Sequence, residues 1–229
     1  MSIPGLFITG TSTGVGKTYV ACLIAKSLVE AGRQVGVYKP VSSGCHREKG
    51  RLISPDAMAL WESAGRPGDL ARVCPQCFEA ALAPHLAARA EGKQVDADLL
   101  KLGINYWRER DEIVLVEGAG GLLSPLDNEL YNADLALEFG FPLIVIAPSE
   151  LGVINQTLQT LVTASTFRDG LRVAGVVLND VCEPLDDSST LSNREQLEAR
   201  CVPPVLDHVG WQATALDRGV DWAGLAEGA

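Results

Sequence analysis

Short apolar runs alternate along this chain with longer segments in which apolar residues recur every three or four positions. The runs predict buried strands of a parallel sheet, and the periodic segments predict helices that pack against it. The expected strands are 3–8, 35–38, 113–116, 142–147, 173–178 and a short edge strand at 205–206. The expected helices are 17–31, 57–63, 97–108, 132–139, 151–167 and 193–200, the last opened by a capping box at 192–195. This alternation predicts an α/β fold with helices on both faces of a parallel sheet.

Four segments lack either pattern. Residues 45–55 are polar and predict a loop, 66–87 contain prolines and predict irregular structure, 181–192 predict another loop, and 213–228 form a weakly patterned tail. We find no internal repeat, low-complexity tract or linker that would divide the 229 residues. The chain therefore predicts a single domain, 1–229.

The stretch Gly-Thr-Ser-Thr-Gly-Val-Gly-Lys-Thr at 10–18 lies between the first apolar run and the first helix. Strand, glycine-rich turn and helix in this order predict a phosphate-binding loop, because backbone N–H groups and a helix N-terminus converge on one anion. Lys17 can reach the outer phosphates, and the Thr18 hydroxyl can bind Mg²⁺. Thr11 takes the place of the usual first glycine. The alternative is an ordinary glycine turn.

A carboxylate, Glu117, follows the apolar run 113–116 and precedes Gly-Ala-Gly-Gly at 118–121. An acid at a strand end, about a hundred residues after a phosphate loop, is typical of the residue that meets Mg²⁺ in such folds. The glycines predict close approach of the backbone to a ligand. The alternative is a strand end with one exposed Glu.

Lys39 and Ser43 follow the strand 35–38, and Asp56 opens the next helix. Chemistry in open α/β sheets collects at the carboxyl ends of strands, so the first two positions favour a role at the site. We expect Lys39 to serve the chemistry rather than the fold. The alternatives are a solvated surface lysine for Lys39 and a helix cap for Asp56.

Composition narrows the class of protein. The formal net charge is −10 and the isoelectric point is about 4.8, which argues against a nucleic-acid-binding protein. A secretory signal and apolar runs of membrane-spanning length are both missing, so we expect a cytoplasmic protein that does not enter the membrane. Cys74 and Cys77 have a zinc-like spacing, with His85 as the nearest histidine. This set is incomplete, and two free thiols are the alternative.

Several motifs together resemble dethiobiotin synthetase, in that family's order and spacing over residues 5–180. They are Gly10-Thr11-x-Thr13-x-Val15-Gly16-Lys17-Thr18, Tyr38-Lys39-Pro40-Val41 with Ser43-Gly44, Asp56-Ala57, Pro84-His85, Val116 to Gly121, Leu151-Gly152 with Ile154-Asn155, and Asn179-Asp180. The segment 181–229 is divergent.

The resemblance implies a P-loop enzyme that uses ATP and Mg²⁺ to close the urea ring of dethiobiotin from 7,8-diaminononanoate and CO₂. It implies catalytic roles for Lys17 and Lys39, and Mg²⁺ ligands at Thr18, Asp56 and Glu117. Substrate contacts would come from Thr13, Ser43, Leu151, Gly152 and Asn155, the last three across the interface of a homodimer. The implied nucleotide contacts are Gly14, Val15, Gly16, Lys17, Thr18, Tyr19, Asp56, Glu117, Gly118, Ala119, Gly120, Asn179, Asp180, Gly210, Trp211 and Asp217.

The chain departs from the family at Ser12 and Gly14, where many members carry Asp and Glu. The Gly14 departure removes a candidate partner for the ammonium of the diamine. Two other functions compete with ring closure. A related amidoligase would carry an additional glutaminase domain, and a partitioning-type ATPase would carry a lysine early in the phosphate loop; no Lys or Arg precedes Lys17.

Overall fold

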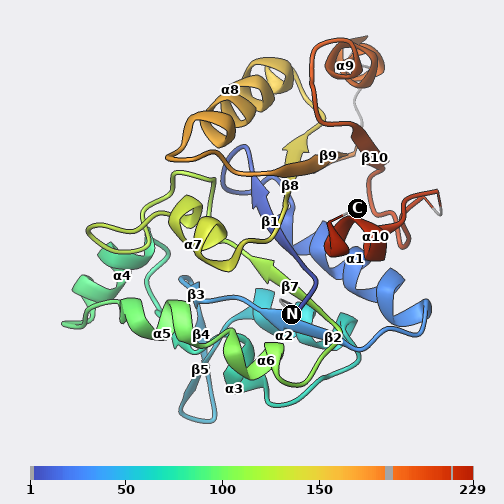
Figure 1. The fold of residues 1–229 in the computed structure, drawn as a ribbon. Coiled ribbons are helices and arrows are strands. Elements are labelled where there is room, and N and C mark those ends of the chain that lie inside the picture. The colour runs from blue at the N-terminus through green and yellow to red at the C-terminus, as the bar shows by residue number, and fades with distance from the viewer. Residues whose placement is uncertain (1–2, 184–187, 218, 229) are drawn as a thin grey trace.

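The computed structural model describes residues 3–183, 188–217 and 219–228, which fold around a parallel six-stranded sheet of order β10-β9-β8-β1-β7-β2 (Figure 1). The strands are β1 (Gly5–Gly10), β2 (Val35–Tyr38), β7 (Ile113–Glu117), β8 (Leu143–Pro148), β9 (Val173–Asn179) and β10 (Val205–Val209). All six predicted strands are confirmed, although β10 is longer than expected. Two small sheets pair β3 (Val41–Ser42) with β6 (Gln76–Cys77) and β4 (His46–Glu48) with β5 (Arg51–Ile53).

The helices lie on both faces of the large sheet, which confirms the predicted fold class (Figure 1). They are α1 (Lys17–Glu30), α2 (Pro55–Ser63), α3 (Leu70–Val73), α4 (Pro84–Ala90), α5 (Ala97–Leu102), α6 (Asn105–Arg108), α7 (Asn132–Phe139), α8 (Val153–Thr166), α9 (Ser188–Glu198) and α10 (Trp222–Glu227). None of the helices in the described ranges has the length and apolar character that crossing a membrane requires.

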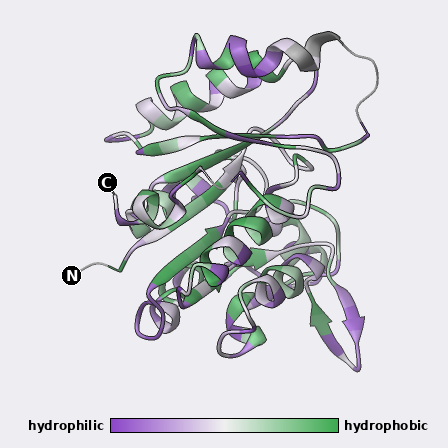
Figure 2. Ribbon diagram, turned by 90° about the vertical axis from the view of Figure 1, so that its right-hand side faces the viewer, coloured by the Kyte–Doolittle hydropathy of each residue, from purple (hydrophilic) through white to green (hydrophobic). Residues whose placement is uncertain are grey.

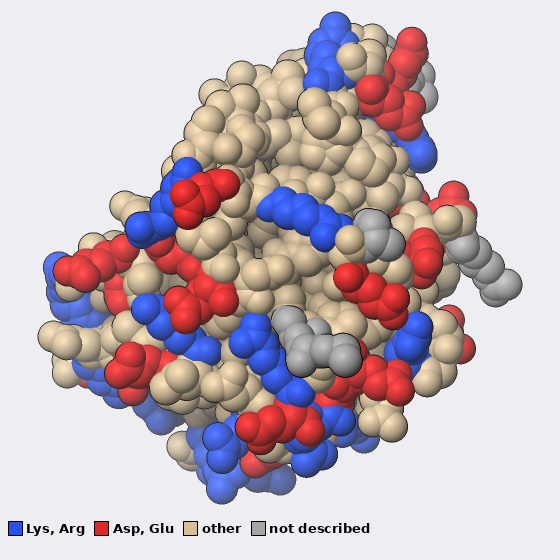
Figure 3. All heavy atoms as spheres, viewed as in Figure 1, with Lys and Arg blue, Asp and Glu red and all other residues tan. Residues whose placement is uncertain are grey.

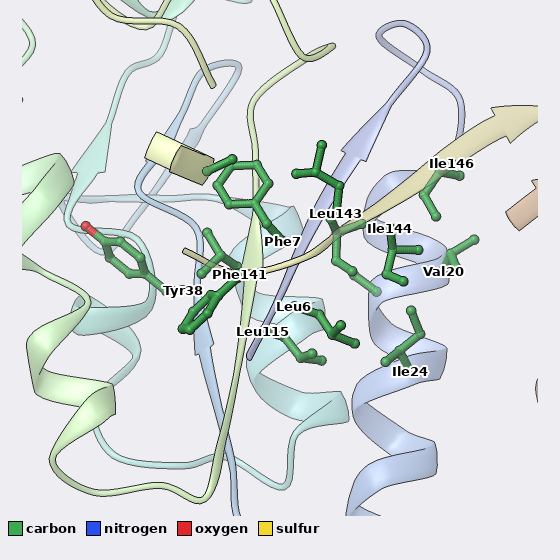
Figure 4. Packing of buried hydrophobic residues seen from close by; sticks show 14 of the residues in the cluster. Leu6, Phe7, Val20, Ile24, Tyr38, Leu115, Phe141, Leu143, Ile144 and Ile146 are labelled. Atoms are coloured by element: carbon green, nitrogen blue, oxygen red, sulfur yellow. The ribbon is translucent and has the colours of Figure 1, made fainter. Parts of the chain in front are cut away.

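The core is built on β1, in which all six residues are buried. Successive side chains of a strand point to opposite faces, so both faces of β1 need apolar partners. Leu6 lies on the face that Val20 and Ile24 of α1 cover (Figure 4). Phe7 lies on the other face, with its ring centroid 6.4 Å from that of Phe139 in α7. This two-sided burial explains why β1 is apolar throughout and fixes the loop that follows it.

The predicted loop at 45–55 is wrong, because β4 and β5 form an antiparallel hairpin there with His46 opposite Ile53. All three residues of β4 are exposed, and the hairpin projects from the body of the molecule with β4 purple in Figure 2. A strand that buries neither face has no apolar alternation for a sequence pattern to detect. The predicted irregular segment 66–87 likewise contains α3, β6 and the start of α4.

The predicted helix 97–108 is broken into α5 and α6 between Leu102 and Asn105. The Tyr38 hydroxyl reaches the last turn of α5, where it lies 2.9 Å from the carbonyl oxygens of Leu99 and Leu100. A Cβ at Gly103 would collide with this hydroxyl. At the break, the Tyr38 hydroxyl thus occupies the space that a side chain at residue 103 would need, and the local pattern does not contain this contact.

The end of the chain also differs from expectation. Helix α9 begins at Ser188, so the predicted capping box at 192–195 lies within the helix and is wrong. Of the loop predicted at 181–192, residues 184–187 lie outside the described residues. The weakly patterned tail contains α10, where the Asp221 side chain accepts a hydrogen bond from the backbone N–H of Gly224.

Candidate functional site

The phosphate-loop prediction rests on the segment 11–16, which connects the carboxyl end of β1 to α1. Gly14 and Gly16 have φ angles of +80° and +86°, a region that disfavours any side chain. Gly16 is the N-cap of α1, and no side chain caps the helix there. A Cβ at Gly16 would also collide with the amide nitrogen of Asn179. The loop therefore leaves the N–H groups of the first turn of α1 to an anion.

Lys17 is buried and folds back over the loop. Its Nζ donates to the Ser12 carbonyl oxygen at 3.1 Å. Burial lowers the pKa of Lys17, and the nearby Glu117 partly opposes that shift. The Ser12 carbonyl oxygen is a neutral acceptor. A phosphate is charged and would therefore form a stronger hydrogen bond with the Lys17 ammonium.

Four predicted site residues form one hydrogen-bonded network at the carboxyl ends of β2 and β7. Lys39 Nζ lies 2.7 Å from Glu117 Oε1 and 3.1 Å from Asp56 Oδ2. Thr18 Oγ1 donates to the same Glu117 oxygen at 2.7 Å. These residues come from four separate elements, and the strand ends and helix starts bring them together as the sequence indicated.

Burial makes this network unusual. Lys39 is 3% exposed and Glu117 is 1% exposed. Burial alone would lower the pKa of Lys39, but Glu117 and Asp56 together raise it above its usual value, so the ammonium stays charged. Lys39 thus emerges at the sheet edge, as expected, but it is no surface residue. Its pairing with a buried carboxylate gives it a role in stability that the sequence did not indicate.

The same residues fit a magnesium ion. Glu117 Oε2 is buried and has no hydrogen-bond partner among the described residues, so one acceptor of the carboxylate is unused. Thr18, Asp56 and Glu117 offer three oxygen donors, which are the ligands that Mg²⁺ prefers. Asp56 lies in the first turn of α2 but does not cap the helix. Ser54 does so by accepting from the N–H of Ala57.

A cavity of about 450 Å³ opens above the network. Of the predicted residues it is lined by Thr13, Gly14, Gly16, Lys17, Thr18, Tyr19, Lys39, Ser43, Asp56, Glu117, Gly118, Ala119 and Gly120. Val41 and Ser42 also line it and were not predicted. The Ser42 hydroxyl accepts a hydrogen bond from Ser54 at 2.8 Å. Proximity to Lys39 and Ser43 was the only available signal for Ser42.

A second cavity of about 330 Å³ shares Gly14, Gly16 and Tyr19 with the first. Its remaining lining residues are Asn179, Asp180, Val181, Trp211 and Gln212. Asn179 Nδ2 donates to the Val15 carbonyl oxygen at 3.1 Å, while Asn179 Oδ1 is buried and unpaired among the described residues. An unused acceptor in a cavity beside the phosphate loop suits a ligand group that donates a hydrogen bond.

Two side-chain contacts shape this second cavity. His208 Nε2 lies 2.8 Å from Asp180 Oδ1, and the Tyr19 hydroxyl bonds to the Ala213 carbonyl. The latter contact joins α1 to the segment after β10. Sequence reasoning missed His208, Val181 and Gln212. Val181 follows β9, whereas His208 lies in β10 and Gln212 after it, where the sequence has no recognisable motif.

Other predicted residues lie away from these two cavities. Val15 is buried in the core. Leu151 is 81% exposed, and Gly152 caps α8 with φ of 100°. Neighbouring Gln156 lines a third cavity of about 400 Å³, together with 11–13 and 121–125 of the loops after β1 and β7.

Asn155, Gly210 and Asp217 line neither of the first two cavities. The Asp217 N–H donates to Asp207 Oδ2 at 2.9 Å, and the Gly210 carbonyl accepts from Ala213 at 3.0 Å. These two residues therefore shape the segment after β10 rather than the cavity walls.

The cysteines show no metal-binding cluster. Cys74 and Cys77 are free thiols with their sulfur atoms 3.6 Å apart. Within the described ranges, no group of three or more His, Cys, Asp and Glu side chains is arranged to hold a metal ion. The pKa of Cys77 is raised to about 12, where a hydrogen bond from Cys45 opposes the effects of Cys74 and burial.

Comparison with known proteins adds sequence relatives and structural neighbours. Residues 4–215 match a family model described as an AAA domain. The chain is 41% identical over 214 residues to the ATP-dependent dethiobiotin synthetase BioD of Rhodopirellula baltica, covering 89% of this chain and 82% of the relative. It is 34% identical over 209 residues to the protein of the same name from Idiomarina loihiensis, covering 90% and 93% of the two chains.

Solved structures share the fold at low identity. The signal recognition particle receptor FtsY from Elizabethkingia anophelis in complex with GDP superimposes with a TM-score of 0.56 at 14% identity, covering 99% of this chain and 63% of that one. A ParA family ATPase from Chlorobium tepidum gives 0.56 at 12% identity, covering 91% and 85%. These similarities concern the fold alone.

Proposed function

This chain belongs to the ATP-dependent dethiobiotin synthetase family, and from that membership we propose that it converts 7,8-diaminononanoate, CO₂ and ATP into dethiobiotin, ADP and phosphate. The observation that carries the proposal is the cluster of Thr18, Lys39, Asp56 and Glu117 beside the phosphate loop, in which Lys39 and Glu117 are buried. It supplies two kinds of group, a cation and oxygen donors, at the place where a terminal phosphate would lie.

In the proposed reaction, one amine of the substrate first combines with CO₂ to give a carbamate. The terminal phosphoryl group of ATP passes to a carbamate oxygen, and the second amine then attacks the carbonyl carbon. Phosphate leaves and the urea ring closes. Phosphoryl transfer depends mainly on positioning and charge stabilisation, so the chain's task is to neutralise charge that grows on oxygen.

Lys17 and Lys39 perform that task in this proposal. Lys17 extends from Ser12 to the transferred phosphoryl group, and Lys39 stabilises the carbamate. Thr18, Asp56 and Glu117 hold Mg²⁺, which neutralises charge on the phosphates of ATP when it is bound. Thr13 and Ser43, on the wall of the same cavity, contact the substrate.

The second cavity is proposed to hold the adenine. Asn179 Oδ1 is free to accept from the exocyclic amine, and Tyr19 and Trp211 offer aromatic walls. Asp180 lines the same space, whereas Gly210 and Asp217 lie outside the lining, so the proposal gives them no contact with the nucleotide. The proposal treats residues 1–229 as one catalytic domain, which the position of β10 in the large sheet supports.

We further propose a homodimer in which Leu151, Gly152 and Asn155 reach the substrate of the partner protomer. The N–H groups at the start of α8 would bind the substrate carboxylate. Two observations support an interface at α8. The helix contains no charged residue, and Leu151 and Val162 are 81% and 61% exposed. The corresponding surface is largely uncharged in Figure 3.

The proposed reaction is tested by incubating the protein with ATP, Mg²⁺, bicarbonate and 7,8-diaminononanoate and measuring dethiobiotin by mass spectrometry. One ADP should form for each dethiobiotin, and omission of the diamine should abolish both. Each reaction is repeated without metal and then with Mg²⁺ restored. ADP formation that does not depend on the diamine would contradict the proposal.

A further inference from the structure

The cation expected between Asp56 and Glu117 already has a substitute within the chain. Lys39 Nζ lies 3.1 Å from one carboxylate and 2.7 Å from the other. Glu117 Oε1 accepts from both Lys39 and Thr18, so the ammonium lies among all three residues to which we assign Mg²⁺. In this arrangement the Lys39 ammonium neutralises the two carboxylates, as a bound metal cation would.

Burial explains why such a substitute is needed. A carboxylate that is 1% exposed has lost its hydration and requires a positive partner. The titratable groups lining the cavity are Lys17, Lys39, Asp56, Glu117 and Tyr19. With the two lysines and the two acids charged, their formal charges cancel. A free divalent ion therefore meets a site whose carboxylates are already neutralised.

A divalent ion could use the two carboxylate oxygens that Lys39 contacts only if Lys39 gave up both of its ion pairs. The ammonium would then remain, desolvated, beside two further positive charges in one cavity. A nucleotide changes this balance because its phosphates bring negative charge. They offer new partners to both lysines at the moment when the metal takes the carboxylates.

We propose that Lys39 holds the metal site as a place-holder cation in the nucleotide-free protein, so that the divalent metal is admitted only together with the nucleotide. The inference rests on the proposed assignment of Thr18, Asp56 and Glu117 as metal ligands. It adds a second task for Lys39, which is to keep the ligands in place and to exclude free metal.

Binding of Mn²⁺ without nucleotide tests the proposal, with free Mn²⁺ measured by its electron paramagnetic resonance signal. The parent protein should bind less than roughly a tenth of an equivalent of Mn²⁺ at about 100 µM free metal, because binding would leave the buried ammonium of Lys39 unpaired. Lys39→Met keeps an unbranched side chain, one atom shorter than that of lysine, and removes its charge. It should bind Mn²⁺ at least tenfold more tightly than the parent.

Two further variants identify the site of that binding. Lys26→Met removes an exposed lysine of α1 and should match the parent. Lys39→Met combined with Glu117→Gln should lose the gain in affinity, because the buried carboxylate is then neutral. A gain that survives in the double variant would overturn the proposal.

The parent alone keeps the proposal falsifiable if Lys39→Met does not fold. One equivalent of Mn²⁺ bound to the parent at 100 µM free metal without nucleotide would overturn it, as would a folded Lys39→Met that binds no more tightly than the parent. Dethiobiotin formation by the parent is measured on the same samples. If either of these Mn²⁺-binding results is found while the parent still forms dethiobiotin, only the place-holder role is rejected. A parent that forms no dethiobiotin would reject the proposed function.

Discussion

At the scale of single residues, the site depends on charges that are held out of water. Lys39 and Glu117 form a buried pair, and in such pairs the loss of one partner is far more damaging than the loss of both. The position of Lys39 at a strand end suggested a purely chemical role. Its burial and its pairing with Glu117 add a contribution to stability to the catalytic role that we propose for it.

Lys39→Ala should therefore have two effects. The rate constant kcat should fall by ~10²–10³, as for other preorganised donors to a developing charge. Unfolding free energy should fall by ~3–5 kcal/mol, because Glu117 is left buried and unpaired. Steady-state kinetics and urea titration measure the two effects. Adding Glu117→Gln should restore part of the lost stability but none of the activity, and strictly additive losses would contradict the pairing.

Cysteine reactivity should follow burial. Burial raises the pKa of Cys22 to about 11, with a hydrogen bond to Ser63 opposing the shift and the nearby Glu117 and Asp56 adding to it. The raised pKa means that the folded protein favours the neutral thiol of Cys22. The resulting contribution to folding stability is complete below the thiol's ordinary pKa of 9.0 and is lost as the pH rises through about 11. At pH 8, Cys22 should react with iodoacetamide much more slowly than the exposed Cys182. Peptide mass spectrometry gives both rates, and equal rates would show that α1 opens readily.

At the scale of elements, the link between β1 and α1 is the most demanding part of the backbone. Gly14 and Gly16 share a left-handed conformation, but only Gly16 lies against another side chain. Substitutions at the two glycines therefore distinguish the effect of backbone strain from the effect of a collision with Asn179.

Gly16→Ala should weaken ATP binding and lower stability by more than the ~1–2 kcal/mol that a left-handed alanine costs by itself. Gly14→Ala should show only that smaller loss, since a Cβ there meets no atom within 4 Å. Fluorescent-nucleotide titration and thermal unfolding compare the two variants. If Gly14→Ala proves the more damaging, contact with Asn179 does not constrain the loop.

The elements predicted well are those whose burial leaves a local pattern. Strands β1, β2 and β7 and helices α1 and α7 carry continuous or periodic apolar residues, and each ends at a glycine or charged residue or directly before one. The exposed hairpin β4–β5 and the break between α5 and α6 depend on pairing and on Tyr38, which no local pattern records.

The residues of the candidate site also differ in how well the sequence predicts them. Lys39, Asp56 and Glu117 stand at element ends, so topology alone brings them together. His208 and Gln212 lie in a divergent segment, and only the folded chain shows that they border the second cavity or its wall. Ser54, in contrast, could have been found, because serine directly before Pro55 is a frequent helix cap.

At the scale of the whole molecule, the proposed dimer accounts for exposed apolar residues on a helix without charge. Val162 lies on α8, and Val202, which is 99% exposed, lies outside the helices. The two valines allow the same substitution to be made inside and outside the proposed interface.

Val162→Lys should shift the protein toward monomers, because an interface that buries an unpaired charge is strongly weakened. Ring closure should fall with it if α8 completes the partner's substrate site. Val202→Lys should leave both properties unchanged. Sedimentation velocity measures the assembly, and a parent protein that is monomeric at micromolar concentration would contradict the dimer.

The order of the strands has a consequence for how the chain is made. β1 is synthesised first, yet it pairs with β7 and β8, which begin more than a hundred residues later. At ribosomal rates of ~5–20 residues per second, β1 waits roughly 5–20 s for its first strand partner, while α1 can cover only one of its faces in that time. During translation the proposed nucleotide site therefore begins on a strand whose backbone and second face are still unpaired. This interval gives chaperones that bind nascent chains an opportunity at β1.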